Sequence, residues 1–207
     1  MSRLRRVLIA AAAAALLAAS ACGSQDATSA PSGAQSGLPT PVTAVSHDAS
    51  APQRLVIDGA SAPIEPVATD ARGTLLPPTD VAKLGWWVDS ALPGSGAGTI
   101  VIAGHVDDAD QGVGYAAEFA HLATGGTVTV ETADGHDLPY RVTRIVDAQK
   151  EGTGADAVPF GELNRLDGPE TLALVTCGGP FVGPPLGYRD NIVVFAVPTA
   201  DAAPTPS

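Results

Sequence analysis

Short runs of strand-forming residues, separated by turn-forming residues, constrain the fold of this chain more than any other feature. Residues 99–104 (TIVIAG) form a continuous apolar run, as expected for a strand that is buried on both faces. Residues 127–132 (TVTVET) alternate between apolar and polar side chains, and ADGH at 133–136 then supplies a turn. Further strands are expected at 54–57, 64–68, 138–148, 171–176 and 191–197.

Helical periodicity is weak by comparison. Short helices are expected only at 79–87, 115–122 and 160–166. Many short strands with only short helical insertions favour an all-β domain, either a closed barrel or a sandwich. We expect one folded domain that spans residues 54–198.

The N-terminal residues 1–22 have the charge order of a secretory signal peptide. A basic segment, Ser2–Arg6, precedes the uncharged apolar run 7–19, and small residues then lead to Cys22. The apolar run is too short for a comfortable membrane span. The sequence at Cys22 also looks like a bacterial lipoprotein processing site, which would leave Cys22 acylated and the protein on the extracellular face of the cell membrane. Simple secretion after cleavage and an uncleaved anchor are the alternatives.

Two segments of biased composition flank the expected domain. Residues 23–53 and 199–207 are rich in Ser, Ala, Pro and Thr, so they cannot bury enough apolar surface to offset the entropy of ordering. We expect a disordered tether before the domain and a disordered tail after it. The formal net charge of −11 argues against nucleic acid, and against an anionic membrane surface, as a direct partner.

The cysteine count matters because exported proteins meet oxidising surroundings, in which cysteines usually pair. The chain has two cysteines, Cys22 and Cys177. If Cys22 is acylated, Cys177 has no partner within the chain and is a candidate reactive thiol. A Cys22–Cys177 disulfide and an inert buried thiol are the alternatives.

Three side chains suited to acyl transfer lie next to expected strands. His105 and Cys177 each follow a strand directly, and Arg189 lies just before the last strand. Adjacent strands that end at the same rim of a barrel would bring the three side chains together. A thiolate can attack a carbonyl carbon, an imidazole can move the proton, and a guanidinium can bind the carbonyl oxygen or the oxyanion. Taken singly, each residue has an ordinary structural explanation, which for Arg189 is an ion pair with Asp190.

The three residues lie in longer motifs: IAGHVD at 102–107, LVTCGG at 174–179 and GYRDNIVV at 187–194. Together and in this order, these motifs resemble those of the sortases, which are bacterial cysteine transpeptidases of the cell surface. The CGG and YRDN segments look most like the class F group of actinobacteria. The resemblance covers residues 54–198 and implies an eight-stranded closed β-barrel. It places the cysteine at the end of the seventh strand and the arginine at the start of the eighth.

The resemblance also implies a role for each of the three side chains. Cys177 would be the nucleophile that forms an acyl-thioester, His105 the general acid and base, and Arg189 the group that stabilises the substrate or the oxyanion. Substrate-binding residues are expected next to the nucleophile, at Thr176, Gly178 and Gly179. The proline-rich segment 178–188 is expected to form one wall of the substrate groove.

Sortases cleave a sorting signal of the LPxTG kind between Thr and Gly and pass the acyl group to an amine. The resemblance therefore implies two kinds of partner: surface proteins that carry a sorting signal, and an amine acceptor such as a peptidoglycan precursor, which water can replace. We expect a monomer without a cofactor. We also expect no metal, because the acidic cluster at Asp107, Asp108 and Asp110 lacks EF-hand-like spacing.

Two other interpretations of the motifs stay open. The domain could be a degenerate sortase fold that serves as a binding module on the cell surface. It could also be a cysteine enzyme of another lineage, such as an L,D-transpeptidase, although the Ser-His-Gly-Cys-x-Arg pattern typical of those enzymes is absent from the sequence.

Overall fold

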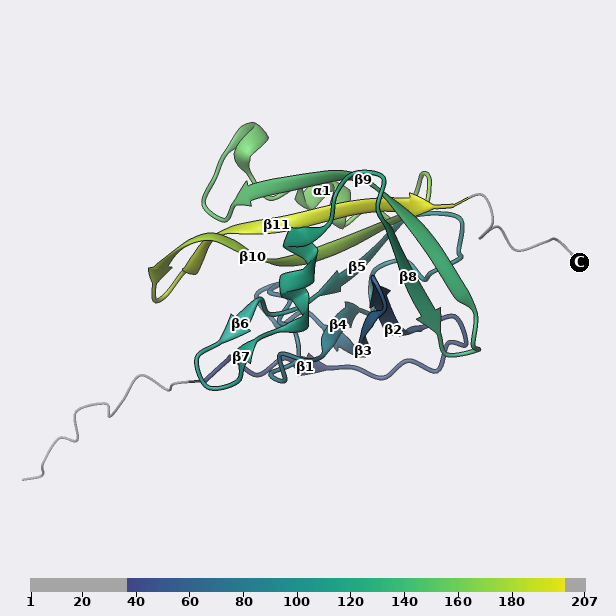
Figure 1. The fold of residues 1–207 in the computed structure, drawn as a ribbon, viewed down its shortest axis with the longest axis horizontal. Helices are drawn as coiled ribbons and strands as arrows, with labels where there is room; N and C mark the ends of the chain where they lie inside the picture. The colour runs from purple at the N-terminus through teal and green to yellow at the C-terminus, as the bar shows by residue number, and fades with distance from the viewer. Residues whose placement is uncertain (1–36, 200–207) are drawn as a thin grey trace, which may run out of the picture. The chain divides into compact units, whose positions relative to one another are not determined.

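The computed structural model of the protein describes residues 37–199. The signal segment with Cys22, the linker residues 23–36 and the tail from residue 200 lie outside the described residues. The strands (Figure 1) are β1 (Val42–Thr43), β2 (Pro52–Ile57), β3 (Ala60–Ala68), β4 (Leu84–Trp87), β5 (Thr99–Ala103), β6 (Asp107–Asp108), β7 (Gly112–Val113), β8 (Thr127–Thr132), β9 (Asp137–Gln149), β10 (Thr171–Gly183) and β11 (Gly187–Pro198). The helical elements are η1 (Tyr115–His121) and η2 (Gly154–Asp156), both 3-10 helices, and the α-helix α1 (Phe160–Leu163).

Eight of these strands close into a barrel, in the order β3-β2-β8-β9-β11-β10-β5-β4. The ring closes because β4 pairs with β3 in parallel, while β1 joins the sheet as an additional antiparallel neighbour of β3. Counted along the chain within this ring, β10 is the seventh strand and β11 the eighth. The all-β, eight-stranded closed barrel with short helical elements is thus confirmed.

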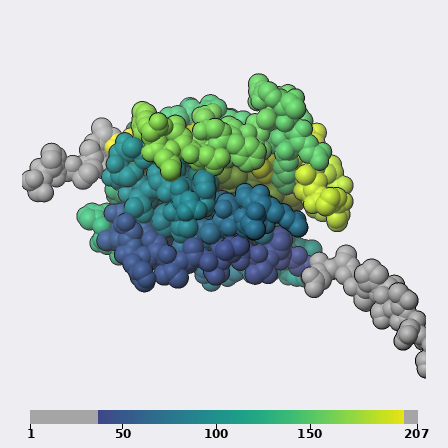
Figure 2. Space-filling view, turned by 180° about the vertical axis from the view of Figure 1, so that it is seen from behind, coloured from purple at the N-terminus to yellow at the C-terminus, as the bar shows by residue number. Residues whose placement is uncertain are grey.

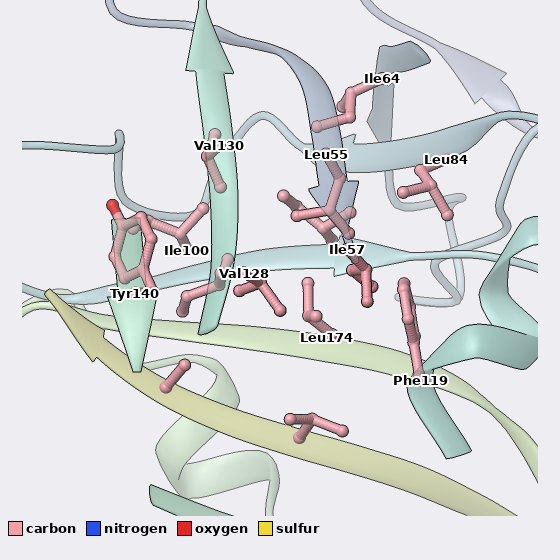
Figure 3. Packing of buried hydrophobic residues seen from close by; sticks show 14 of the residues in the cluster. Leu55, Ile57, Ile64, Leu84, Ile100, Phe119, Val128, Val130, Tyr140 and Leu174 are labelled. Atoms are coloured by element: carbon pink, nitrogen blue, oxygen red, sulfur yellow. The ribbon is translucent and has the colours of Figure 1, made fainter. Parts of the chain in front are cut away.

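The interior of the barrel is filled by aliphatic side chains from alternate positions of its strands. Val128 and Val130 of β8 are both buried, as are Leu55 of β2, Ile100 of β5 and Leu174 of β10. Figure 3 shows these side chains gathered together, with Phe119 of η1 packed against them. Burying one such aliphatic side chain stabilises a fold by about 1.5–3 kcal/mol, so the alternation in the sequence is sufficient reason for the barrel to close around this core.

A second, smaller cluster lies against the outer face of the barrel. Its buried members are Val101, Ala148, Val158, Leu163, Ala173, Val193 and Phe195. Along β10, Ala173 alternates with Leu172 and Leu174, which belong to the interior cluster, so the two clusters occupy opposite faces of the sheet. The segment between β9 and β10, which contains α1 and is drawn in green along the upper edge of Figure 2, contributes Val158 and Leu163 to this outer layer.

The structure differs from the sequence-based expectations at several boundaries. The helix expected at 79–87 is wrong, because Leu84–Trp87 is strand β4, paired with both β3 and β5. A Cβ atom at Gly85 would lie 2.8 Å from the Val67 side chain, so this segment is placed by close packing between neighbouring strands. The expected strand 171–176 continues as β10 to Gly183, and the segment expected to be a loop is largely a hairpin with β11.

Residues 37–53, which the sequence assigns to the linker, are partly built into the sheet. β1 pairs with β3, and the Ala44 amide donates a hydrogen bond to the carbonyl oxygen of Pro66. β1 is only two residues long and both of its residues are exposed, so no hydrophobic pattern distinguishes it from linker. Backbone hydrogen bonds to β3 place it in the sheet.

Candidate active site

Cys177 lies within β10, directly opposite Asn191 of β11. Because side chains alternate along a strand, Cys177 shares the outer face with Ala173 and Val175, while Thr176 faces the barrel interior and is only 3% exposed. Cys177 itself is half-buried and is a free thiol. The fold therefore holds the thiol on a rigid strand and presents it at the outer surface.

A groove of about 570 Å³ runs along the same outer face. Its floor includes Val175, two residues before Cys177, and Asn191, the cross-strand partner of Cys177. Its walls include Leu75, before β4, and Phe160 of α1. No residue of the 178–188 segment lines this groove, and the role of that segment as a wall of the substrate groove stays a prediction.

His105 follows β5, the parallel neighbour of β10. The last pair in their register is Ala103 with Val175, so His105 and Cys177 each lie two residues beyond it along their chains. The Gly104 amide donates a hydrogen bond to the Val175 carbonyl oxygen at 3.0 Å. The buried Thr176 hydroxyl donates to the Gly104 carbonyl oxygen, also at 3.0 Å. These two bonds fix the residue before His105 against the strand that carries the thiol.

The His105 imidazole is half-buried, and its Nε2 atom is buried without a hydrogen-bond partner among residues 37–199. Burial lowers the pKa of His105 below its usual value, because it disfavours the charged imidazolium. The Pro77 carbonyl and the carboxylates of Asp108 and Asp107 act in the opposite direction but more weakly. The imidazole is therefore neutral at pH 7 and able to accept a proton.

Arg189 lies near the start of β11 and forms a two-point ion pair with its neighbour Asp190. Nε donates to Oδ1 and Nη2 donates to Oδ2 of the carboxylate, both at 2.7 Å. The Asp190 side chain is 8% exposed, whereas the Arg189 side chain is 49% exposed. The hydrogen bonds from Arg189 lower the pKa of the Asp190 carboxyl group. The structure thus contains the ion pair that the sequence suggested, and it lies one position along the hairpin from Cys177, since Asp190 is opposite Gly178.

The two glycines after Cys177 make room for side chains of β11. A Cβ atom at Gly178 would lie 2.6 Å from Cγ1 of Ile192. At Gly179, which has a φ of +69°, a Cβ atom would overlap the Asp190 carboxylate. Both glycines thus pack closely against β11 next to Cys177, and their contact with the substrate stays a prediction.

Lys150 is a site residue that the sequence analysis missed. It follows β9, and its Nζ atom donates to the Cys177 sulfur at 3.5 Å and to the Leu186 carbonyl oxygen at 3.2 Å. The available signal was the rarity of lysine: the chain has two, Lys83 and Lys150. Lys83 is accounted for by an ion pair with Glu65 at 2.7 Å.

A second missed contact joins the hairpin to the segment after His105. The Tyr188 hydroxyl donates to Asp107 Oδ2 at 2.6 Å, and the Phe181 ring packs edge-on against the Tyr188 ring, with 5.3 Å between ring centres. The hydrogen bond to Asp107 raises the pKa of the Tyr188 hydroxyl. This contact ties the tip of the β10–β11 hairpin to the end of the barrel that carries His105.

No group of three His, Cys, Asp or Glu side chains within residues 37–199 is arranged to hold a metal ion. None of the helices described there has the length and apolar character needed to cross a membrane.

Comparisons with known proteins place this geometry in a family. Residues 55–199 match the family described as a sortase domain, whereas a search of curated proteins gives no match. Sortase C-1 from Actinomyces oris is a structural neighbour, with 22% identity, a TM-score of 0.52 and coverage of 70% of this chain and 72% of that one. Sortase C1 from Streptococcus suis has 17% identity and a TM-score of 0.53, with coverage of 77% and 76%.

A lid mutant of sortase A from Corynebacterium diphtheriae is also similar, with 21% identity, a TM-score of 0.50 and coverage of 70% of this chain and 68% of that one. Identities this low show a shared fold. The family match is stronger, since it spans nearly all of the barrel, from Leu55 in β2 to the residue after β11. The chain therefore belongs to the sortase family, whose members are cysteine transpeptidases.

Proposed function

We propose that this protein is a transpeptidase of the class F sortase type that cleaves an LPxTG-like sorting signal through a thioester on Cys177. One observation carries the proposal: a half-buried free thiol lies two residues beyond Val175, which lines an apolar groove, and a buried imidazole with a lowered pKa directly follows the neighbouring parallel strand. The family relationship adds the reaction class.

The groove suits the apolar start of such a signal. Trp87 and Leu75 line it together with Phe160 and Val158, and Val101 and Val175 lie on its floor. Apolar walls favour leucine and proline side chains, because burying each of them removes apolar surface from water. A peptide that lies along β10 would then bring its Thr–Gly bond to Cys177.

The reaction transfers one acyl group in two steps. His105 takes the thiol proton, the Cys177 sulfur attacks the threonine carbonyl carbon, and the oxyanion collapses as the C–N bond to glycine breaks. His105 returns the proton to the leaving amine, which leaves a thioester on Cys177. In the second step, an amine or water attacks the thioester and gives a proton to His105, the C–S bond breaks, and His105 returns the proton to the Cys177 sulfur.

Arg189 and Thr176 support these steps in different ways. The ion pair with Asp190 uses Nε and Nη2 of Arg189, so the remaining N–H groups of its guanidinium can bind a substrate carbonyl or the oxyanion. The Thr176 hydroxyl donates its hydrogen bond to the Gly104 carbonyl oxygen, so Thr176 would act by positioning the backbone before His105. Gly178 and Gly179 shape the strand on which the thioester forms.

The cellular setting follows from the N-terminal sequence. We propose that an exported chain, acylated at Cys22, works on the extracellular face of the cell membrane. Its clients would be surface proteins that carry a sorting signal, and its acceptor an amine such as a peptidoglycan precursor.

The test is a turnover assay with the mature protein, a panel of LPxTG-like peptides, and a glycine-based or a diamino acid acceptor. We expect cleavage between Thr and Gly and an acceptor-dependent ligated product. Cys177→Ala and His105→Ala should each abolish turnover, while Arg189→Ala should lower kcat/KM. Binding of peptides without turnover by the wild-type protein would contradict the proposal and favour a binding module.

A further inference from the structure

The Cys177 sulfur is in direct contact with an ammonium group. Lys150 Nζ donates to Sγ at 3.5 Å, and a second bond to the Leu186 carbonyl oxygen at 3.2 Å anchors the ammonium from the hairpin turn. The Lys150 backbone is held as well, because its amide donates to the Arg189 carbonyl oxygen at 3.1 Å. The lysine side chain is long and flexible, so hydrogen bonds are needed to hold its ammonium group in one place. In Lys150 one such bond fixes the backbone and another fixes the ammonium group.

The other charged and titratable groups around the thiol are largely engaged elsewhere. On β11, the Arg189 charge is balanced by the buried Asp190 carboxylate, and the Tyr188 hydroxyl donates to Asp107 of β6. After β5, burial keeps His105 neutral. Lys150 also acts on the Asp190 carboxylate and lowers its pKa, but more weakly than Arg189 does, and its ammonium is the positive group that donates a hydrogen bond to the sulfur.

We propose that Lys150 is a further catalytic residue, whose ammonium stabilises the Cys177 thiolate during attack. The inference rests on the proposed function above. The thiol proton goes to His105, and the hydrogen bond from the ammonium to the sulfur strengthens as negative charge develops there. Lys150 lies outside all three sortase-like motifs, so the motifs alone do not predict a positive charge beside the Cys177 sulfur.

The experiment measures alkylation of Cys177 by iodoacetamide as a function of pH. The reaction joins the sulfur to the reagent carbon with loss of iodide, and mass spectrometry of the Cys177 peptide separates it from any reaction at Cys22. The variants are Lys150→Met, which keeps the length of the side chain without the charge, and Lys150→Arg, which keeps the charge. Lys83→Met is the matched control, because it removes the chain's other lysine from an exposed ion pair.

Loss of the ammonium should raise the midpoint of the pH profile and slow alkylation at pH 7 by about tenfold, the change expected when one unit of pH separates the two midpoints. Lys150→Arg should restore most of the rate, and Lys83→Met should match the wild type. Iodoacetate, an anion, should lose more rate than neutral iodoacetamide when Lys150 becomes Met. In peptide turnover, Lys150→Met should lower kcat more than it raises KM.

Superimposable alkylation profiles of the wild type and Lys150→Met, with both proteins folded by circular dichroism, would overturn the inference. Its failure is distinct from failure of the proposed function, because alkylation needs no sorting peptide. Wild-type turnover with unchanged profiles would reject the role of Lys150 alone. Shifted profiles without any wild-type turnover would reject the transpeptidase and leave only the contact between Lys150 and the thiolate.

Discussion

Burial of the His105 imidazole is the feature at the residue scale on which the proposed mechanism depends most. The proposed mechanism needs an imidazole that starts neutral, and burial supplies it by lowering the pKa of His105. The same burial leaves Nε2 without a hydrogen-bond partner among the described residues, a position that a reacting thiol or amine can fill. A buried nitrogen without a hydrogen-bond partner lowers the stability of the fold. We interpret this loss of stability as a consequence of keeping the nitrogen available for proton transfer.

The lowered pKa predicts a pH dependence of stability. The unfolded chain binds a proton at His105 near pH 6.5, while the folded protein binds it only at lower pH, so the unfolded state gains protons first. The free energy of unfolding should therefore fall as the pH drops below about 6.5, and it should fall less in His105→Gln. Urea denaturation of both proteins at pH 7.5 and pH 5.5 measures this difference. Equal losses in the two proteins would contradict the burial of a neutral imidazole.

At the scale of elements, the β10–β11 hairpin carries most of what the sequence did not predict. The segments at 127–132 and 171–176 were predicted correctly as strands, because the first alternates between apolar and polar residues and the second is a short, mainly apolar run. The pairing of β10 beyond Cys177 was missed, since glycines and prolines there hide the pattern. β4 was missed because its four residues are placed by packing on both sides.

The residues of the candidate site also fall into those that the sequence predicts and those that it does not. His105, Cys177 and Arg189 could be found from local motifs. Lys150 could not, because its contact with the thiol depends on how the end of β9 pairs with β11 and on the turn at Leu186. Such contacts join distant segments and leave no short-range trace in the sequence.

The hairpin also supports a prediction that separates backbone strain from packing. Gly179 and Gly183 both have positive φ angles, of +69° and +84°, but only at Gly179 would a Cβ atom meet another group, the Asp190 side chain. Gly183→Ala should cost about 1 kcal/mol of unfolding free energy from strain alone. Gly179→Ala should cost at least about 1 kcal/mol more, because the Asp190 carboxylate must move and its pair with Arg189 is disturbed.

Urea denaturation compares the two variants directly, and peptide turnover shows whether the ion pair matters for catalysis. Gly183→Ala should keep most of the activity, whereas Gly179→Ala should lose it in parallel with its stability. Equal destabilisation of the two variants would show that Gly179 is needed for its backbone angle only.

At the scale of the whole molecule, the inner face of the barrel sheet forms the hydrophobic core, and its outer face carries the candidate site. Inward positions of its strands, such as Leu174 and Val130, build the core. Outward positions on β5, β9, β10 and β11 build the smaller outer cluster, the apolar groove and the site around Cys177. Parallel pairing of β5 with β10 brings His105 and Cys177, the residues proposed to react, to the same end of the sheet.

Trapping of the acyl-enzyme tests the central claim most directly. The mature protein, mixed with an LPxTG-like peptide without an acceptor amine and quenched in acid, is analysed by intact-mass and peptide-mapping mass spectrometry. We predict an adduct with the mass of the peptide up to its threonine, mapped to Cys177 and released by hydroxylamine, as a thioester should be. Persistence of the adduct in Cys177→Ala, or cleavage of the peptide by the wild type without any adduct at Cys177, would contradict the account.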